Sequence, residues 1–130
     1  MAKNNYNIEF LFKALADRTR LRLISLIGDT EVCVCFVVVI LKISQPKISR
    51  HLAYLRRAGI VSARREGKWM HYRLAEPPDE HAARIFREVR ASLAEHPEFQ
   101  RDREKLAQVC CAPNLPVQLR RAPRPSLIAA

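Results

Sequence analysis

The stretch that decides the fold is residues 44–59, SQPKISRHLAYLRRAG. Ser44 is suited to cap a helix, Pro46 fits the first turn, and Gly59 follows a basic last turn and ends the helix. Three apolar residues recur at helical spacing and predict one buried face: Ile48, Leu52 and Leu55. The other faces carry donors for phosphates and base edges, which is typical of a recognition helix. The alternative interpretation is an ordinary solvated amphipathic helix.

Composition favours a single folded domain with an anionic partner. The chain has 130 residues, of which 48% are hydrophobic, and carries 23 Lys and Arg against 13 Asp and Glu, a formal net charge of +10. Such an excess favours nucleic acid as the partner. We expect no membrane span, because no apolar run approaches the roughly 18 residues that a span needs. The N-terminus does not look like a signal peptide, so we expect a cytoplasmic protein.

The first half of the chain predicts helices over residues 8–16 and 18–27, with Asp17 capping the second and Gly28 ending it. Residues 32–41, VCVCFVVVIL, form an unbroken apolar run. By propensity this run is a buried strand. By position it is the first helix of a helix-turn-helix, which the following helix needs as a brace. We choose the helix.

Residues 60–64 and 69–74 are β-prone and flank a turn that contains Gly67, which predicts a hairpin. A cationic hairpin directly after a recognition helix is expected to act as a wing on DNA. A hairpin that only covers the core is the alternative, and His71 is expected to pack or to face phosphate rather than to bind a metal. Together, the helix and the wing supply the expected DNA contacts, namely Ser44, Gln45, Lys47, Ser49, Arg50, His51, Tyr54, Arg65 and Lys68.

After Pro77-Pro78 we expect a helix from Asp79 to about Glu95. One small domain cannot bury so many apolar helical faces, so this helix and the first helix are expected to pair with their copies in a homodimer. The expected organisation is a DNA-binding and dimerisation domain over 1–96, a helical extension over 97–111 and a disordered basic tail over 112–130. The expected fold class is mainly α with a small β-hairpin, a winged helix-turn-helix.

The chain resembles the ArsR/SmtB family of winged-helix metalloregulatory repressors, and within it the arsenic-responsive members. The resemblance rests on residues 13–27 (KALADRTRLRLISLI), 31–36 (EVCVCF), 44–61 (SQPKISRHLAYLRRAGIV) and 67–74 (GKWMHYRL). It implies a homodimer that binds a palindromic operator, represses a detoxification operon and releases DNA when an inducer binds. The implied inducer is arsenite or antimonite, with no catalytic cofactor.

The cysteines match the family only in part. Arsenic-responsive members often carry Cys-Val-Cys followed by Asp-Leu-Cys, and this chain matches the first two thiols with Cys33 and Cys35. Phe36 stands where the usual Asp would fall, and Val38 where the third Cys would fall. Other relatives place adjacent cysteines near the C-terminal helix, which Cys110-Cys111 resemble. Whether Phe36 and Val38 mark a specialised or a weakened site stays open.

Thiolates select soft ions, and the resemblance implies three of them around trivalent arsenic or antimony. Residues two apart face different sides of a regular helix, so Cys33 and Cys35 can share one atom only if the helix unwinds locally or begins after Cys33. The third thiol would come from Cys110 or Cys111 of either subunit, or each pair would form a separate site. The alternative for Cys33 and Cys35 is that they are small buried hydrophobes.

The same residues are compatible with other functions. The four cysteines could form a redox switch or a zinc or cadmium site in a repressor of the same fold. A non-specific nucleoid binder is a further alternative. An enzyme is not expected, because there is no Cys-x-x-Cys, no phosphate-binding glycine loop and no catalytic carboxylate pair, and the chain has 3 Gly in all.

Overall fold

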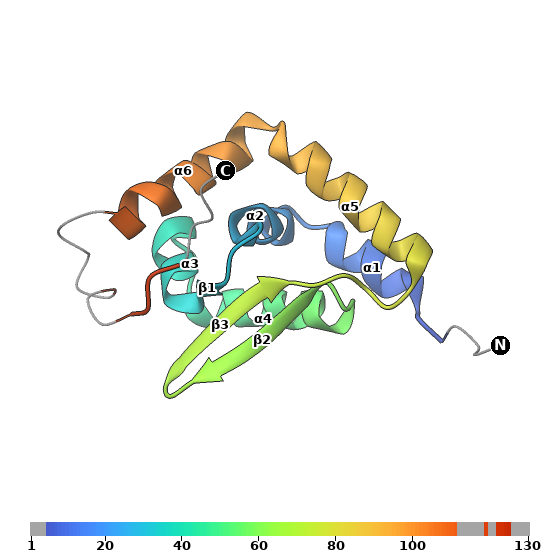
Figure 1. The fold of residues 1–130 in the computed structure, drawn as a ribbon, viewed down its shortest axis with the longest axis horizontal. Helices are drawn as coiled ribbons and strands as arrows, with labels where there is room; N and C mark the ends of the chain where they lie inside the picture. Colours follow the sequence, from blue (N-terminus) through green and yellow to red (C-terminus); the bar gives the residue numbers. More distant parts are fainter. Residues whose placement is uncertain (1–4, 112–118, 120–121, 126–130) are drawn as a thin grey trace.

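The computed structural model describes residues 5–111, 119 and 122–125. Helix α2 lies at the centre; α5 and α6 form a bent arm on one side of it, and α4 and the hairpin lie on the other (Figure 1). The elements in chain order are α1 (Ile8–Leu15), α2 (Arg18–Ile27), β1 (Val32–Cys33), α3 (Val34–Leu41), α4 (Gln45–Arg57), β2 (Val61–Glu66), β3 (Trp69–Leu74), α5 (Glu80–Ala94) and α6 (Pro97–Cys111).

Side-chain caps fix the starts of the helices before and after the DNA-binding motif. Asp17 accepts a hydrogen bond from the backbone nitrogen of Arg20 at 3.1 Å, so α2 begins as predicted. Asp79 does the same for Ala82 at 2.9 Å and starts α5. Gly28 ends α2 at φ 52°, a left-handed conformation that favours glycine.

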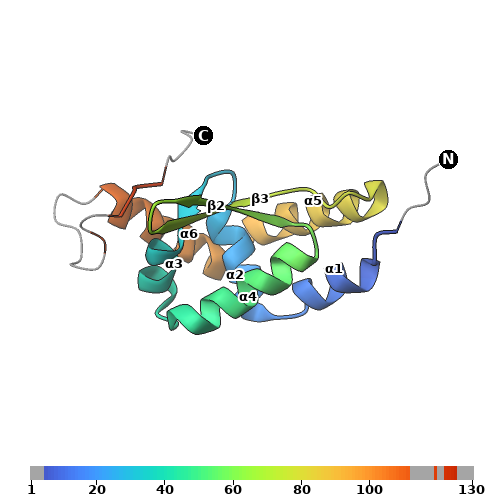
Figure 2. The ribbon, with the colours of Figure 1, turned by 90° about the horizontal axis from the view of Figure 1, so that it is seen from below.

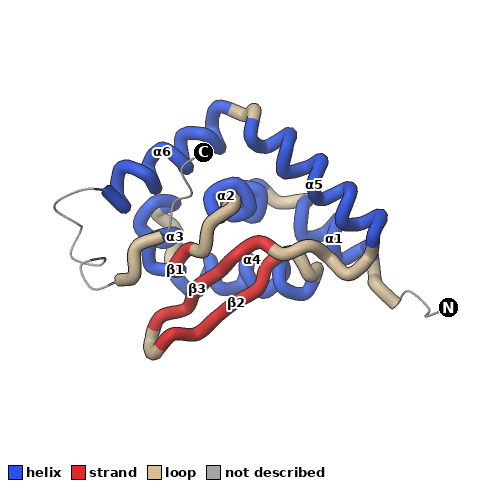
Figure 3. The backbone as a smooth tube through the Cα atoms, in the orientation of Figure 1, coloured by secondary structure: helices blue, strands red, loops and turns tan. Residues whose placement is uncertain are grey.

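The prediction of one helix over residues 32–41 was wrong at its first two positions. Val32 and Cys33 form a short strand that pairs with β3, with Val32 opposite Tyr72 and Cys33 opposite His71. Pairing satisfies the backbone of these buried residues, so the strand propensity of the run prevails here. The helix then begins at Val34, directly after the first cysteine. The result is a three-stranded sheet in the order β1-β3-β2 (Figure 3).

The hairpin is present, and its turn is tighter than expected. Strand β2 continues to Glu66, which pairs with Trp69, so Gly67 and Lys68 alone form the turn. Gly67 has φ 60°, as the first position of a two-residue hairpin turn requires. With α3, α4 and this hairpin in sequence, the predicted fold class of a mainly helical winged helix-turn-helix is confirmed.

Helix α4 buries the predicted face: Ile48, Leu52 and Leu55 are at most 1% exposed. Helix α1 buries only part of its apolar surface. Leu11 and Ala14 are fully buried, whereas Ile8 and Phe12 are 37% and 53% exposed. The reason is the 100° step between successive helical residues: with Leu11 turned to the core, Phe12 points away from it.

Helix α6 occupies residues 97–111, where the sequence predicts a helical extension. It spans 15 residues because it has its own buried face, formed by Phe99, Asp102, Leu106 and Cys110. Leu119 is also fully buried, and Arg124 Nη1 donates to the carbonyl of Cys110 at 3.0 Å. Most of the predicted 112–130 tail lies outside the described residues. None of the described helices is long and apolar enough to cross a membrane.

Candidate nucleic-acid interface and thiol pair

Helix α4 lies along one edge of the molecule, and the C-terminal half of the helix lies beside α1 (Figure 2). Ser44 occupies the N-cap position without a side-chain hydrogen bond to the helix. The side chains predicted to reach DNA from the first two turns are all exposed: Gln45, Lys47, Ser49 and Arg50. A donor-rich helix start of this kind can reach phosphates and base edges.

His51 and Tyr54 are held by a neighbour from α2, unlike the other residues predicted on α4. The Nη1 of Arg20 lies 3.3 Å from His51 Nδ1, and the Arg20 guanidinium lies 4.5 Å from the centroid of the Tyr54 ring. The His51 side chain is 23% exposed, and Tyr54 is 49% exposed. Both residues therefore remain reachable from solvent while their inner sides are fixed.

The wing presents its two predicted cations at the tip of the hairpin. Arg65 Nε donates to the carbonyl of Gly67 at 3.1 Å, and Lys68 Nζ lies 5.0 Å from the centroid of the Trp69 ring. Midway along β2, Arg64 Nη2 donates to Glu31 at 2.6 Å. That ion pair ties β2 to the loop before β1, so the wing is braced by the segment that carries the first cysteine.

Cys33 and Cys35 lie at the junction of β1 and α3. Cys33 is 1% exposed and occupies the N-cap position of α3 with extended backbone angles. The two thiols interact with each other. The Cys35 thiol and, to a smaller extent, the Cys35 backbone and His71 lower the pKa of Cys33 to about 6, against the effect of burial. The same contact, together with burial, raises the pKa of Cys35. The pair therefore releases its first proton at a lower pH than an ordinary thiol does, and its second proton at a higher pH.

The thiol pair is joined to both elements predicted to bind DNA. Helix α3 packs against α4, and Cys33 stands opposite His71 of the wing strand β3. His71 is 5% exposed, and its Nε2 lies 3.3 Å from Glu66 Oε1 at the end of β2. A displacement of Cys33 would therefore change the positions of the recognition helix and of the wing.

The second pair of cysteines lies at the end of α6. Cys110 is 8% exposed, its Sγ is 4.0 Å from the carbonyl of Pro125, and α6 packs partly against α3. The side chain of Cys111 lies outside what the structure describes. Among the described side chains, no three or more of His, Cys, Asp and Glu gather closely enough to hold a metal ion. Phe36, at the position of the family's usual Asp, is fully buried.

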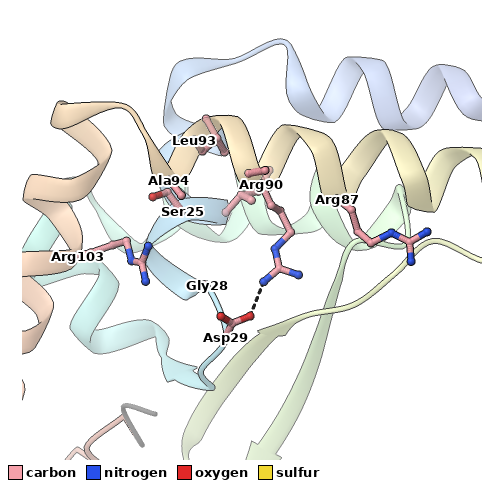
Figure 4. Close-up of a pocket in the computed structure, with 10 residues that line it drawn as sticks. Ser25, Gly28, Asp29, Arg87, Arg90, Leu93, Ala94 and Arg103 are labelled. Carbon is pink, nitrogen blue, oxygen red and sulfur yellow. Dashed lines mark hydrogen bonds and ion pairs between the residues drawn. The ribbon is translucent and has the colours of Figure 1, made fainter. Parts of the chain in front are cut away.

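A separate hollow lies between α2, α5 and α6 (Figure 4). It measures about 210 Å³ and is lined by Ser25, Asp29, Arg87, Arg90 and Arg103 among others. Asp29 Oδ1 accepts a hydrogen bond from Arg90 Nη2 at 2.6 Å, so the Asp29 carboxylate is paired with an arginine of α5. None of the residues predicted to bind DNA or metalloid lines it. We interpret this hollow as the place where the end of α2 meets the arm formed by α5 and α6.

Sequence reasoning missed three contacts of this region. Arg20 lies in the helix predicted over 18–27, and nothing in its spacing signals that it reaches α4. His71 was expected to pack or to face phosphate; it is buried and stands opposite Cys33. The Glu31–Arg64 pair spans 33 positions in the chain. Such contacts depend on tertiary placement, although the β-branched residues around Cys33 did signal a strand that could have revealed the pairing.

Known proteins resemble the chain in this same region. The sequence profile of the family described as "Bacterial regulatory protein, arsR family" matches residues 17–63. The arsenical resistance operon repressor of Escherichia coli is 50% identical over 80 residues, which are 61% of this chain and 68% of that protein. The arsenic resistance transcriptional regulator ArsR1 of Pseudomonas putida is 57% identical over 65 residues, 49% of this chain. The chain spans about half of that relative, 51%.

Solved structures also resemble the fold of this chain. HlyU from Vibrio cholerae superposes with a TM-score of 0.58 at 29% identity, covering 73% of this chain and all of HlyU (100%). The relatives that match this chain in sequence and in fold are therefore regulators. The residues matched by the family profile include α2, the thiol pair, α4 and the start of the wing.

Proposed function

The chain belongs to the ArsR family of bacterial regulatory proteins, and from this premise we propose that it represses an operon in response to trivalent arsenic or antimony. The family and the relatives are transcriptional regulators, so the chain is a regulator and not an enzyme. The proposed repressor binds operator DNA as a dimer and releases it when thiolates bind the metalloid.

A single observation carries the proposal: the neighbouring thiols Cys33 and Cys35 lie at the start of α3, which braces the recognition helix. Thiolates are the ligands that soft ions prefer. Because α3 begins after Cys33, both cysteines reach one side without unwinding of the helix. The pair is also fixed to the wing through Cys33 and His71. A ligand that binds more tightly to a different arrangement of this junction lowers the affinity for DNA. The coupling is reciprocal, so bound DNA lowers the affinity for the ligand by the same free energy.

In the bound state we assign α4 to the major groove and the hairpin tip to the phosphates beside it. Lys47 and Arg50 extend from the exposed face of α4, with Ser44, Gln45, Ser49, His51 and Tyr54 around them. Arg65 and Lys68 reach from the wing. No described carboxylate pairs with Lys47, Arg50 or Lys68. Their charges are therefore available to DNA.

We propose a homodimer whose interface includes the outer face of α1. Phe12 and Ile8 expose 53% and 37% of their surface, and Ile85 and Val89 of α5 are only partly buried. A two-fold dimer buries such faces against their copies. It also places two recognition helices on the two halves of a palindromic operator.

The donor set fits a metalloid only in part. Cys33 and Cys35 supply two soft sulfur donors, and the described side chains bring no third donor close enough. We propose that a thiol of the α6 end, Cys110 or Cys111, completes the set after a movement of α6 against α3, from the same subunit or the other. A zinc or cadmium response has less support, because a tetrahedral site needs four such donors.

A redox response is the second candidate, and the interaction between the two thiols favours it. Lowering the pKa of Cys33 to about 6 leaves a thiolate at neutral pH, and the thiolate is the form that peroxides oxidise. Two thiols that form a disulfide give two protons and two electrons to hydrogen peroxide, which becomes two molecules of water. This candidate predicts DNA release by peroxide and recovery with dithiothreitol.

The test is fluorescence anisotropy of a labelled duplex that the protein itself has selected from a random pool. We expect tight binding of the selected duplex, weak binding of an unrelated one at the same salt, and release by micromolar arsenite in the presence of reductant. Equal binding of both duplexes would indicate a non-specific binder. Release by peroxide but not by arsenite would favour the redox candidate.

A further inference from the structure

Arg20 lies where α1, α2 and α4 meet, and each of its guanidinium nitrogens has a hydrogen-bond partner. Nε donates to the carbonyl of Ala14 at 2.9 Å and Nη2 to the carbonyl of Lys13 at 2.7 Å, which fixes the side chain to the end of α1. Nη1 lies 3.3 Å from His51 Nδ1, and the guanidinium faces the Tyr54 ring at 4.5 Å. One side chain of α2 thus holds two residues of the recognition helix.

The Arg20 contact decides which ring nitrogen of His51 carries the proton. A guanidinium only donates hydrogen bonds, so His51 Nδ1 must accept. In a neutral imidazole whose Nδ1 accepts, the proton is on Nε2. Asp17 Oδ1 lies 3.9 Å from Nδ1, too far to compete as an acceptor for a proton there.

The other edge of the His51 ring is available to a ligand. Within the described part of the chain, Nε2 has no hydrogen-bond partner, and no side-chain nitrogen without a partner is buried there. Nε2 therefore faces solvent with a hydrogen to donate. His51 and Tyr54 are three residues apart on α4, so they are neighbours on one face of the helix.

We propose that Arg20 is a positioning residue for DNA recognition, which fixes His51 so that it presents an Nε2–H donor and holds the Tyr54 ring beside it. This inference rests on the proposed function, because it assigns what α4 presents to DNA. An N–H donor selects an acceptor on the duplex, either a phosphate oxygen or the acceptor edge of a purine, and rejects an exocyclic amine.

The first test uses the free protein and needs no DNA. Two-bond nitrogen–proton correlation spectra of the imidazole, recorded at a pH where the ring is neutral, distinguish the nitrogen that carries the proton. We expect His51 of the wild type to be protonated on Nε2, and Arg20→Gln to show a mixture of both tautomers. A proton on Nδ1 in the wild type, or identical spectra for both proteins, would overturn the assignment.

The second test measures affinity for a duplex that the wild-type protein selects from a random pool. In His51→Gln the amide nitrogen extends to the place of Nε2, whereas in His51→Asn the carbonyl stays near the place of Nδ1 and the outer donor is lost. We expect His51→Gln to bind nearly as the wild type and His51→Asn to bind about tenfold more weakly, the loss of one hydrogen bond. Equal affinities of the two variants would contradict the proposal.

Two further comparisons complete the design. If His51→Asn weakens binding to the selected duplex alone, the acceptor is a base edge; if it weakens unrelated duplexes equally, the acceptor is a phosphate. Arg20→Gln is expected to weaken binding about tenfold without lowering the salt dependence, because no phosphate contact is lost. Arg22→Gln, two residues along α2 and with its partner on α6, is the control, and folded protein should keep its DNA affinity. If the wild type selects no sequence, the proposed function fails, while the tautomer measurement still tests the Arg20–His51 contact.

Discussion

Arg22 and Asp102, 80 residues apart in the chain, form a two-pronged ion pair between α2 and α6. Arg22 Nε lies 2.9 Å from Asp102 Oδ2, and Nη2 lies 3.0 Å from Oδ1. Asp102 is 3% exposed. Because the central helix holds the arm in this way, the end of α6 with Cys110 stays beside α3.

Breaking this pair should destabilise the fold. Arg22→Ala leaves a buried carboxylate without its partner, and we expect a loss of about 2–3 kcal/mol in the free energy of unfolding, since part of the arginine is exposed. Urea denaturation measures it. The control is Arg18→Ala, which removes a more exposed pair with Glu98 on the same two helices and should cost less than about 1 kcal/mol. Equal losses in the two variants would mean that burial of Asp102 contributes nothing.

The thiol pair should titrate in an unusual range. In Cys110→Ser/Cys111→Ser, where only Cys33 and Cys35 remain, we expect one thiolate per chain to appear near pH 6, because the S–H of Cys35 stabilises the Cys33 anion. The second should not ionise up to the ordinary pKa of 9.0, since the pKa of Cys35 is raised. Ultraviolet absorbance of the thiolate measures both steps. Two thiolates that appear together near pH 9 would contradict the contact.

The sign of the accompanying stability change follows from the same shift. Between about pH 6 and the ordinary value of 9.0, the folded chain has released the Cys33 proton and the unfolded chain still binds it. Stability therefore rises with pH across this window and is lost as the pH falls through about 6. Cys33→Ser should flatten this dependence in urea denaturation, whereas Cys110→Ser should leave it in place.

Much of the fold follows from local sequence signals, and the failures have a common cause. Asp17, Asp79 and the Ile48–Leu52–Leu55 face behave as predicted, because caps and helical periodicity act over a few residues. The strand at Val32–Cys33 exists only because β3 lies beside it. Likewise the position of Arg20 against His51 depends on three elements that meet in space. The cysteines could be chosen as candidates from sequence, but their contact and its link to the wing could not.

Arg50 should contribute affinity through its charge on the exposed face of α4. We expect Arg50→Ala to abolish tight binding to the selected duplex while the dimer persists. With Lys68→Ala at the wing tip, binding should weaken across all sequences and the salt slope should fall by about one. Anisotropy titrations over a range of salt concentrations measure both effects. Sequence-specific binding retained by Arg50→Ala would remove this residue from the interface.

Phe12 should hold the proposed dimer together. Phe12→Glu places a charge on the exposed apolar face of α1, where the copy of that face would have to accept it without a partner, so we expect a monomer. Analytical ultracentrifugation gives the mass in solution. The matched control is Glu9→Lys, an exposed polar position on the same helix, which should stay dimeric. A dimer of unchanged strength in Phe12→Glu would place the interface elsewhere.

The central claim is that Cys33 and Cys35 connect the metalloid to DNA release. The most direct measurement is an arsenite titration, under reductant, of the protein–DNA complex formed by Cys33→Ser/Cys35→Ser, with Cys110→Ser/Cys111→Ser as the parallel variant. We predict that the first variant binds the selected duplex as the wild type does and no longer releases it at any arsenite concentration that frees the wild-type complex. Release of DNA by arsenite from Cys33→Ser/Cys35→Ser would contradict the account, and would assign the response to the end of α6.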